Sequence, residues 1–355
     1  MAKVLMKGNE AFGEGAIRAG CRFYFGYPIT PQSELAHFLA KRMPEVGGTF
    51  LQAESELASI NMVFGAAGAG ARAMTSSSGP GISLMQEGIS FIACAELPCV
   101  IVNIMRGGPG LGNIAPVQSD YFQATRGGGH GDYRLIVLAP SSVQEIIDLI
   151  REAFDLAEKY LNPVLMLGDG LLGQMMEPME LNEEKNFFIP PRPWAASGRM
   201  GGPKRIINTL YIVPEEAEKH NLKLNQKYKK IEANEQRWEN YQTEGAQLVL
   251  VAFGTAARIC MGVVDYCRDQ GLPVGLIRPI TLWPFPVKAF DSILSLDTVH
   301  YFLSVEMSTG QMIEDVRLAV NGRRPVFFYG RYGGMLPVLT DVVKEVKKLL
   351  LEEEP

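Results

Sequence analysis

Four short segments of the chain carry polar side chains and flexible backbone of the kinds that bind and act on ligands. They supply a hydroxyl, a carboxylate, a run of backbone N–H groups and a guanidinium, in Tyr27-Pro28-Ile29-Thr30-Pro31, Gln52-Ala-Glu54-Ser-Glu56, Thr75-Ser-Ser77-Ser78-Gly79-Pro-Gly81 and Arg106-Gly-Gly-Pro-Gly110. Each has an ordinary structural explanation. Thr30-Pro31 could start a helix, Glu56 could stabilise a first helical turn, and Arg106 could form a surface ion pair.

The elements around these segments favour a common function. From Arg22 onward, short apolar runs alternate with helical periodicity. We predict strands over 22–27, 49–52, 73–76, 99–105, 135–139 and 164–168, and helices over 32–42, 56–69, 82–94 and 142–160. This alternation is typical of βα units that build a mostly parallel sheet, whose strand ends converge on one crevice. Because each of the four segments follows a predicted strand, we expect them to lie together.

The connection from Arg106 to Arg134 has no clear periodicity and contains eight glycines. Connections this long inside a compact domain are usually functional or disordered. Because this one follows an apolar strand, it would leave the sheet at the edge where ligands bind. We interpret it as a functional loop.

The composition changes after Gln174. A proline-rich stretch over 189–194 and a charged run from Glu215 to Thr243 predict a linker followed by a solvated helix, which could also brace a partner subunit. The α/β pattern resumes at Gln247 and closes with an amphipathic helix over 336–351. The sequence therefore predicts an α/β protein with a second, smaller α/β domain.

Composition and charge exclude several classes. The 355 residues are 47% hydrophobic and 21% charged, which is typical of folded soluble chains. The formal net charge is −5 and no basic block occurs, so nucleic acid is not an expected partner. The five cysteines form no Cys-x-x-Cys pair and the four histidines are dispersed, so we expect no metal site on this chain. The lack of a signal peptide or long apolar span predicts a cytoplasmic protein without a membrane partner.

Other familiar motifs are missing or out of place. There is no Gly-Lys-Ser/Thr phosphate loop and no Gly-x-Ser-x-Gly elbow, which argues against nucleotide hydrolysis and serine-hydrolase chemistry. Gly168-Asp169-Gly170 is similar to the start of the motif that holds Mg²⁺ and diphosphate in thiamine diphosphate enzymes. The second ligand, however, would be Asn182, which comes too early. We interpret this tripeptide as a strand-end turn and expect no diphosphate clamp in this chain.

The chain resembles the α subunit of the 2-oxoacid:ferredoxin oxidoreductases, thiamine diphosphate enzymes that convert 2-oxoacids and coenzyme A into acyl-CoA and CO2. The motifs that carry this resemblance are Tyr27–Pro31, Ser55-Glu56-Leu-Ala-Ser59, Thr75–Gly81, Arg106–Gly110, Gly129-His130-Gly131-Asp132 and Arg278-Pro-Ile-Thr-Leu-Trp-Pro284. They span nearly the whole chain. Overall length and spacing are most similar to the branched-chain 2-oxoisovalerate type, followed by the 2-oxoglutarate type.

The resemblance implies a thiamine diphosphate-binding fold. A pyrimidine-type domain, a mostly parallel sheet flanked by helices, would occupy 1–185, a linker and charged helical segment 186–245, and a transketolase C-terminal-like α/β domain 246–355. A β subunit with the diphosphate motif would complete the cofactor site. Mg²⁺ and 4Fe-4S clusters would lie on partner subunits, which include a γ subunit and a cluster-bearing ferredoxin-like subunit, and ferredoxin would receive the electrons.

The resemblance also implies roles for single residues. Glu56 matches the glutamate that hydrogen-bonds N1′ of the cofactor's aminopyrimidine, Arg106 the arginine that pairs with the substrate carboxylate, and Thr30 the threonine beside the substrate. A carboxylate at N1′ stabilises the tautomer in which the cofactor's own amino group becomes a base. Glu54 is an alternative to Glu56, although the Ser-Glu-Leu-Ala context favours Glu56. The remaining cofactor contacts are expected from Pro28, Ile29, Ser77, Ser78 and Gly79.

Three other functions stay open at this point. The chain could be a 2-oxoglutarate-specific member of the same family, a component of a transketolase-type 2-oxoacid dehydrogenase that feeds a lipoyl carrier, or a catalytically silent scaffold. The Tyr27–Pro31 motif favours the ferredoxin-linked type over the lipoyl-linked type. The presence of Thr30, Glu56 and Arg106 argues against a silent scaffold.

Overall fold

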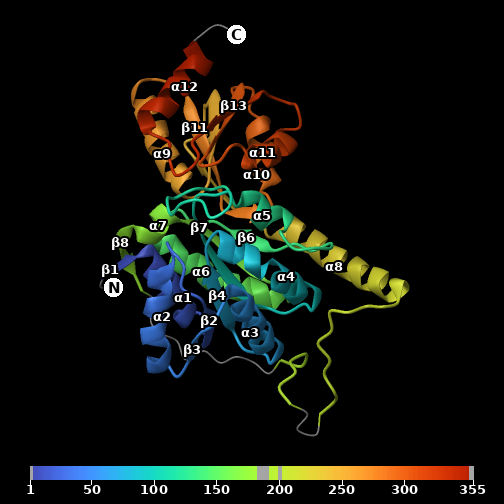
Figure 1. Ribbon diagram of the computed structural model, residues 1–355. Coiled ribbons are helices and arrows are strands. Elements are labelled where there is room, and N and C mark those ends of the chain that lie inside the picture. The colour runs from blue at the N-terminus through green and yellow to red at the C-terminus, as the bar shows by residue number, and fades with distance from the viewer. Residues whose placement is uncertain (1–2, 182–191, 199–201, 352–355) are drawn as a thin grey trace.

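Two β-sheet layers, each flanked by helices, lie one above the other in a computed structural model that describes residues 3–181, 192–198 and 202–351 (Figure 1). The larger sheet has the strand order β12-β6-β7-β5-β4-β2-β3. Its parallel strands are β2 (Phe23–Gly26), β3 (Thr49–Gln52), β4 (Ala73–Ser77), β5 (Val100–Met105), β6 (Ile136–Leu138) and β7 (Val164–Asp169). Strands β4 to β7 are buried along their whole length, as in parallel sheets covered on both faces.

Helices cover this larger sheet on both sides. They are α1 (Gly8–Arg18), α2 (Ser33–Glu45), α3 (Glu56–Gly68), α4 (Pro80–Cys94) and α6 (Val143–Tyr160). Helix α1 packs against α2 and α6, while α3 packs against α4. The α/β class and the parallel order predicted from the apolar runs are confirmed. The elements that were not expected include α1, β1 (Lys3–Lys7) and β8 (Met176–Glu180), the last two forming a small antiparallel sheet.

The smaller sheet has the order β14-β13-β10-β11-β9. Its strands are β9 (Trp238–Tyr241), β10 (Leu248–Val251), β11 (Val274–Pro279), β13 (Tyr301–Glu306) and β14 (Val326–Gly330), and only β9 is antiparallel to its neighbour. The accompanying helices are α9 (Gly254–Asp269), α10 (Val287–Leu294), α11 (Met312–Val320) and α12 (Leu339–Leu351). The predicted C-terminal helix is therefore present. It begins at Leu339 and not at Leu336, since residues 336–338 are not helical.

The motif that begins at Arg278 joins the two layers. Arg278 lies at the end of β11 in the smaller sheet, whereas the next strand, β12 (Thr281–Trp283), pairs antiparallel with β6 in the larger sheet. The guanidinium of Arg278 donates two hydrogen bonds to Glu145 at 2.9 and 3.0 Å and one to Glu239 at 2.8 Å. This buried ion pair connects α6 with the smaller sheet, so the motif has a structural role between the layers.

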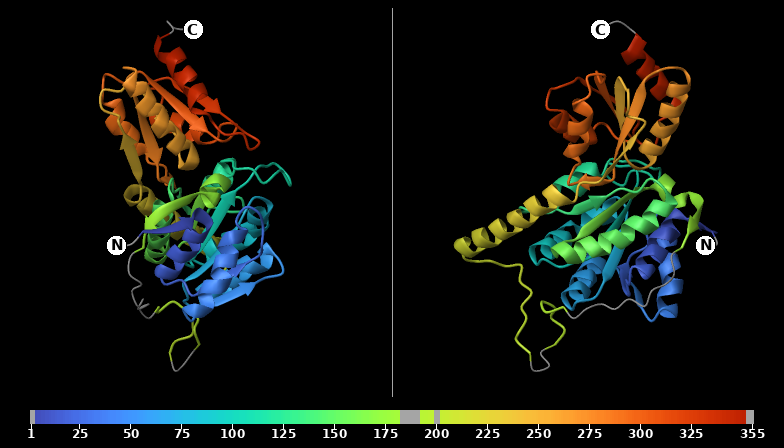
Figure 2. Two further views of the ribbon diagram at one scale, coloured as in Figure 1. Left: turned by 90° about the vertical axis from the view of Figure 1, so that its left-hand side faces the viewer. Right: turned by 180° about the vertical axis from the view of Figure 1, so that it is seen from behind.

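A long helix, α8 (Pro214–Asn234), projects from the side of the molecule (Figures 1 and 2). It buries Leu224, Tyr228 and Ile231 and exposes most of its other residues, as predicted for the charged run. The helix ends at Asn234, however, and residues 238–241 of the run form β9 instead. The expected boundary at residues 185 and 186, and the start of the proline-rich stretch over 189–194, lie outside the described residues. Among the helices that the structure does describe, none has the length and apolar character needed to cross a membrane.

Candidate active site

Four neighbouring strands of the larger sheet place the predicted site segments side by side. The strands β3, β2, β4 and β5 are consecutive in the sheet and parallel, so their carboxyl ends lie along one edge. Residues 53–56 follow β3, residues 27–31 follow β2, residues 78–81 follow β4, and residues 106–110 follow β5. The expected juxtaposition is therefore present, and it follows from the parallel topology.

Glu56 is the first residue of α3, and its side chain is buried. Ser55 caps this helix, because its Oγ accepts a hydrogen bond from the N–H of Ala58 at 3.2 Å. Glu56 is only 5% exposed, and Ser77 Oγ donates to its Oε1 at 3.5 Å. Glu54, in contrast, is exposed. The helix N-terminus favours a negative charge at this position, so the structure presents Glu56 as the buried carboxylate of the site.

The turn after β4 brings its main chain close to the side chains of Arg106 and Glu56. Gly79 has a φ of +48°, and a Cβ atom there would lie 3.3 Å from Nε of Arg106. At Gly81 a Cβ atom would lie 2.4 Å from Oε1 of Glu56. The buried Ser78 Oγ has no hydrogen-bond partner within the described chain. Gly79 and Gly81 thus allow the main chain to approach Arg106 and Glu56 closely. The Ser78 hydroxyl beside them is free to bind a ligand.

Arg106 lies between two loops and keeps part of its hydrogen-bonding capacity. Its Nη1 donates to the carbonyl of Thr30 at 3.0 Å, and its Nη2 donates to the carbonyl of Leu111 at 3.3 Å. The residue is 8% exposed, and its buried Nε–H has no partner among the described residues. A guanidinium has five N–H donors, so Arg106 can hold both loops and still bind an anion.

The loop over 27–31 is fixed by side chains that the sequence did not single out. Gln32 Nε2 donates to the carbonyl of Tyr27 at 3.2 Å, and Gln32 Oε1 accepts from Ser76 Oγ at 2.7 Å. Asn9 Nδ2, from α1, donates to the carbonyl of Pro31 at 2.7 Å. Gln32 directly follows the motif and could have been suspected, whereas nothing in the local pattern marks Asn9.

The side chains of this loop differ in exposure. Pro28 and Thr30 are exposed at the site and Ile29 is half-buried. Ser77, at the end of β4, is fully buried beside Glu56. The structure therefore gathers all of the predicted site residues at one edge of the larger sheet, with Glu56 at the bottom and Thr30 at the surface.

The glycine-rich connection after Arg106 crosses to the smaller sheet. Its tip is held by Asn113, whose Nδ2 donates to the carbonyl of Gly333 at 3.0 Å. Further along, it forms a short helix, α5 (Tyr121–Arg126), and Tyr121 OH donates to Asp315 at 2.6 Å. The sequence showed no periodicity for α5 because it is only six residues long. The connection is thus an ordered link between the layers beside the site.

Asp169 caps a short helix, α7 (Gly170–Gln174). Its Oδ1 accepts hydrogen bonds from the N–H groups of Leu171 and Leu172 at 3.0 and 3.1 Å, and from Thr255 Oγ1 at 2.8 Å. Burial raises the pKa of this carboxyl. Residues 168–170 were predicted to form a strand-end turn, but β7 continues to Asp169 and α7 begins at Gly170, so they form a direct strand-to-helix junction. Among the residues that the structure describes, no three His, Cys, Asp or Glu side chains gather as metal ligands would.

These features fit the aminopyrimidine half of thiamine diphosphate. This half of the cofactor needs a buried carboxylate for a ring nitrogen, which Glu56 provides, and main chain that comes close to that carboxylate, as at Gly81. The buried, unpartnered Ser78 hydroxyl is a further polar contact. A parallel sheet with this edge, followed by a second α/β layer, defines a thiamine diphosphate-binding fold of the pyrimidine type.

The comparisons with known proteins agree with this class. Residues 14–240 match the family described as pyruvate flavodoxin/ferredoxin oxidoreductase, thiamine diphosphate-binding, and residues 246–342 match pyruvate:ferredoxin oxidoreductase core domain II. The chain belongs to the 2-oxoacid:ferredoxin oxidoreductase family. The family and fold expected from the motifs are confirmed, as is an oxidoreductase function with thiamine diphosphate as cofactor.

Individual relatives show which members of the family the chain is similar to. The chain is 52% identical to the ketoisovalerate oxidoreductase subunit VorB of Methanothermobacter thermautotrophicus over 98% of both chains. It is 37% identical to the 2-oxoglutarate synthase subunit KorA of Methanocaldococcus jannaschii, over 93% of this chain and 95% of the relative. The solved 2-oxoglutarate:ferredoxin oxidoreductase of Magnetococcus marinus superposes with a TM-score of 0.89 at 30% identity, covering 98% of this chain and 65% of that one.

Proposed function

We propose that this chain is the α subunit of a branched-chain 2-oxoacid:ferredoxin oxidoreductase. The enzyme would convert 2-oxoisovalerate and coenzyme A into acyl-CoA and CO2 and pass the electrons to ferredoxin. The observation that carries the proposal is the buried Glu56 carboxylate on the same sheet edge as Arg106. The branched-chain substrate is supported by the higher identity to ketoisovalerate subunits than to 2-oxoglutarate subunits.

Glu56 would hold the cofactor by its aminopyrimidine nitrogen. Main chain at Gly79 and the side chains of Pro28, Ile29, Ser77 and Ser78 would surround the ring. When bound, thiamine diphosphate supplies the carbon nucleophile and electron sink that decarboxylation requires. The contribution of this chain is the Glu56 carboxylate, which would hold or release a proton at the ring nitrogen beside the start of α4.

Arg106 and Thr30 would bind the 2-oxoacid. The Nε–H of Arg106 is buried and unpartnered in the described chain, and its Nη1 donates to the main-chain carbonyl of Thr30, whose side chain is exposed. A planar guanidinium pairs with a carboxylate through charge-assisted bonds. The substrate would thus be oriented by its carboxylate, with its reacting carbonyl directed toward the cofactor.

The site on this chain is one half of an active site. We propose that a β subunit supplies the diphosphate and Mg²⁺ ligands, and that γ and ferredoxin-like subunits, the latter with 4Fe-4S clusters, complete the complex. The proposed β-binding surface consists of exposed apolar side chains on two loops joined by the Asn113–Gly333 hydrogen bond, namely Leu111, Ile114, Tyr332, Met335 and Val338. Apolar patches of this kind mark protein interfaces.

The same proposal includes the domain division. Residues 1–185 would form the pyrimidine-type domain, 186–245 the linker and charged helix, and 246–355 the transketolase C-terminal-like domain. The separate family matches over 14–240 and 246–342 support a division near residue 245. Strand β9, at residues 238–241, nevertheless lies in the smaller sheet.

Reconstitution with the partner subunits tests the function. The purified chain alone should not decarboxylate 2-oxoacids, and the assembled complex should reduce ferredoxin with a higher kcat/KM for 2-oxoisovalerate than for 2-oxoglutarate. The reverse preference would assign the 2-oxoglutarate activity instead. Electron transfer only to a lipoyl carrier would indicate the dehydrogenase type, and full activity of a Glu56→Gln, Arg106→Met double variant would indicate a silent scaffold.

A further inference from the structure

The loop over residues 27–31 is held through its main chain, because four of its carbonyl groups accept hydrogen bonds. These are the carbonyls of Tyr27, Ile29, Thr30 and Pro31. Gln32 supplies two of the donors, its side-chain Nε2 to Tyr27 at 3.2 Å and its main-chain N–H to Ile29 at 3.1 Å. Arg106 donates to Thr30, and Asn9 donates to Pro31. The side chain of Thr30 is exposed, so these main-chain bonds fix its position.

The side chain of Gln32 is fully buried, and both ends of its amide are used. Its Nε2 faces the loop, and its Oε1 accepts a hydrogen bond from Oγ of Ser76 at 2.7 Å. Gln32 directly precedes α2, whereas Ser76 lies in β4. A buried amide that is bonded at both ends has one defined orientation, because turning it would leave a donor and an acceptor unsatisfied. Gln32 thus attaches the loop to the larger sheet.

The hydrogen bonds continue from Ser76 into the core of the larger sheet. Oγ of Ser76 lies 2.7 Å from the hydroxyl of Tyr24 in β2, and both residues are fully buried. Since the hydroxyl hydrogen of Ser76 is donated to Gln32, Tyr24 is the donor of this second pair. Burial raises the pKa of Tyr24, so its hydroxyl keeps that proton. The ring of Tyr24 stacks on Phe50 of β3 with centroids 5.4 Å apart. We call Tyr24, Ser76 and Gln32 the loop-anchoring network.

The loop in turn holds the guanidinium of Arg106. Nη1 of Arg106 donates to the carbonyl of Thr30 at 3.0 Å, so a shift of the loop would also shift the guanidinium. Ser77 follows Ser76 in β4 and therefore points to the opposite face of the sheet, where its Oγ meets Glu56. Among the residues that the structure describes, the loop-anchoring network makes no hydrogen bond to Glu56. The network accordingly reaches the side of the site that carries Arg106 and Thr30.

We propose that Gln32 is a positioning residue for the 2-oxoacid. Anchored in the sheet, it sets the place of Thr30 and, through the Thr30 carbonyl, the direction of the Arg106 guanidinium. This inference rests on the proposed function, in which Thr30 and Arg106 bind the substrate. The members of the network are fully buried, so they act on the substrate only through the loop. Loss of the network should therefore lower the use of the 2-oxoacid and leave the binding of thiamine diphosphate unchanged.

Steady-state kinetics of the assembled complex test the proposal. Gln32→Met keeps nearly the length of the side chain and removes both of its hydrogen bonds. Its kcat/KM for 2-oxoisovalerate should fall about tenfold to a hundredfold, because a displacement of about 1 Å at a substrate-binding group has an effect of this size. Tyr24→Phe, which removes only the bond most distant from the loop, should cause a smaller loss of about two- to fivefold. Both variants should bind thiamine diphosphate with the wild-type Kd, measured by isothermal titration calorimetry.

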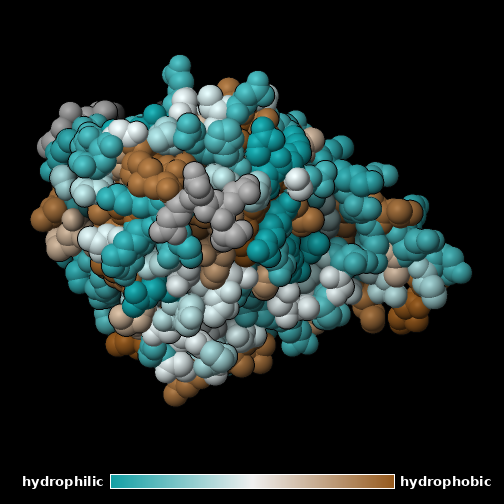
Figure 3. All heavy atoms as spheres, turned by 90° about the horizontal axis from the view of Figure 1, so that it is seen from above, coloured by the Kyte–Doolittle hydropathy of each residue, from teal (hydrophilic) through white to brown (hydrophobic). Residues whose placement is uncertain are grey.

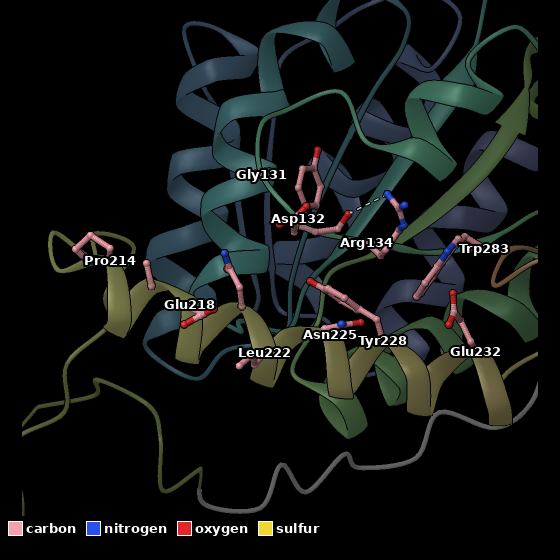
Figure 4. Close-up of a pocket in the computed structure, with 13 residues that line it drawn as sticks. Gly131, Asp132, Arg134, Pro214, Glu218, Leu222, Asn225, Tyr228, Glu232 and Trp283 are labelled. Carbon is pink, nitrogen blue, oxygen red and sulfur yellow. Dashed lines mark hydrogen bonds between the residues drawn. The ribbon is translucent and has the colours of Figure 1, made fainter.

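Tyr228→Phe is the matched control, because it also removes a buried tyrosine hydroxyl. Tyr228 is 7% exposed and lies in a groove along α8, where its ring packs edge-on against Trp283 at 5.9 Å (Figure 4). Its hydroxyl has no hydrogen-bond partner within the described chain, and Trp283 belongs to β12, the edge strand opposite β3. Figure 3 shows the part of the molecule that projects with α8, where apolar residues, in brown, lie among hydrophilic ones. Tyr228→Phe should therefore keep the wild-type kcat/KM and Kd.

The outcomes separate positioning from a structural role. A Gln32→Met variant that unfolds at lower urea concentration but keeps the wild-type kcat/KM would make Gln32 structural only and overturn the proposal. An equal loss of cofactor affinity and of kcat/KM would overturn it too. If Gln32→Met does not assemble, Tyr24→Phe decides, because it leaves every bond of the loop in place, and a wild-type kcat/KM in that variant overturns the proposal. A wild-type complex without activity on any 2-oxoacid would refute the proposed function and this proposal together, whereas an active wild type with unchanged variants refutes this proposal alone.

Discussion

The main chain at Gly81 approaches the carboxylate of Glu56 so closely that a Cβ atom at Gly81 would lie 2.4 Å from Oε1 of Glu56 and 2.1 Å from Oγ of Ser77. Helix α4 therefore begins directly against the proposed cofactor ligand. No residue larger than glycine fits unless the side chains of both Ser77 and Glu56 move. The structure thus couples the position of the proposed cofactor ligand to the start of α4.

We predict that Gly81→Ala lowers kcat of the assembled enzyme by about 10²-fold, because a displacement of the order of 1 Å at a catalytic group has an effect of this size. The matched control is Gly65→Ala in α3, where a Cβ atom meets nothing within 4 Å. Gly65→Ala should keep full activity and raise the free energy of unfolding by up to about 1 kcal/mol. Equal activities of the two variants would contradict this account of Gly81.

Arg106 should affect both catalysis and stability. Arg106→Met removes the anion-binding guanidinium, so kcat/KM for the 2-oxoacid should fall about tenfold to a hundredfold, which corresponds to roughly 1.5–3 kcal/mol. Because the guanidinium also donates to the carbonyls of Thr30 and Leu111, the free energy of unfolding should fall by roughly 1–3 kcal/mol. Steady-state kinetics and urea unfolding measure the two effects. A loss of stability with unchanged kcat/KM would make Arg106 a purely structural residue.

Lys227 should make stability depend on pH. Its Nζ lies 3.4 Å from Oε1 of Glu96, and burial lowers the pKa of Lys227 from 10.5 to about 8 although Glu96 opposes this. Between these pH values the unfolded chain holds the proton that the folded chain has released. Raising the pH from 8 to 10.5 therefore increases the free energy of unfolding. Below pH 8 Lys227 is charged in both states, so the folded state carries the full cost of burying that charge.

The variant Lys227→Met should lack this dependence. Relative to the variant, the wild-type free energy of unfolding should rise by roughly 1–3 kcal/mol between pH 8 and pH 10.5. Urea unfolding at several pH values measures the difference. Lys230→Met, which changes an exposed lysine of the same helix, should follow the wild type. A constant difference between wild type and Lys227→Met over this range would show that Lys227 does not titrate there.

Much of the larger sheet could be predicted because its information is local. Strand β3 coincides with the predicted strand over 49–52, and the other predicted strands differ from the observed ones by at most one residue at either end. Buried parallel strands are short, continuous apolar runs, and the polar or glycine-rich residues after them mark their ends. The sheet-edge position of Glu56 and Arg106 followed from that pattern. Their roles came from the resemblance.

The remainder depends on contacts between distant segments. Strand β12 leaves the layer of its neighbours to pair with β6, and no local pattern distinguishes three residues that change sheets. Asn9 reaches the carbonyl of Pro31 from a helix that lies before the first predicted strand. Whether Glu54 or Glu56 is buried depends on where α3 begins, and element boundaries are the least certain part of a sequence-based assignment.

The most direct test of the central claim is the exchange rate of the thiamine C2 proton in the assembled complex, followed by NMR in D2O. If Glu56 holds the proton at the pyrimidine nitrogen, Glu56→Gln should slow this exchange by about 10²–10⁴-fold. The substitution removes the acid–base group and keeps a side chain of nearly the same size. Glu54→Gln, which changes the exposed neighbour, should exchange at the wild-type rate. Unchanged exchange in Glu56→Gln, with the cofactor still bound, would contradict the claim that this chain activates thiamine diphosphate through Glu56.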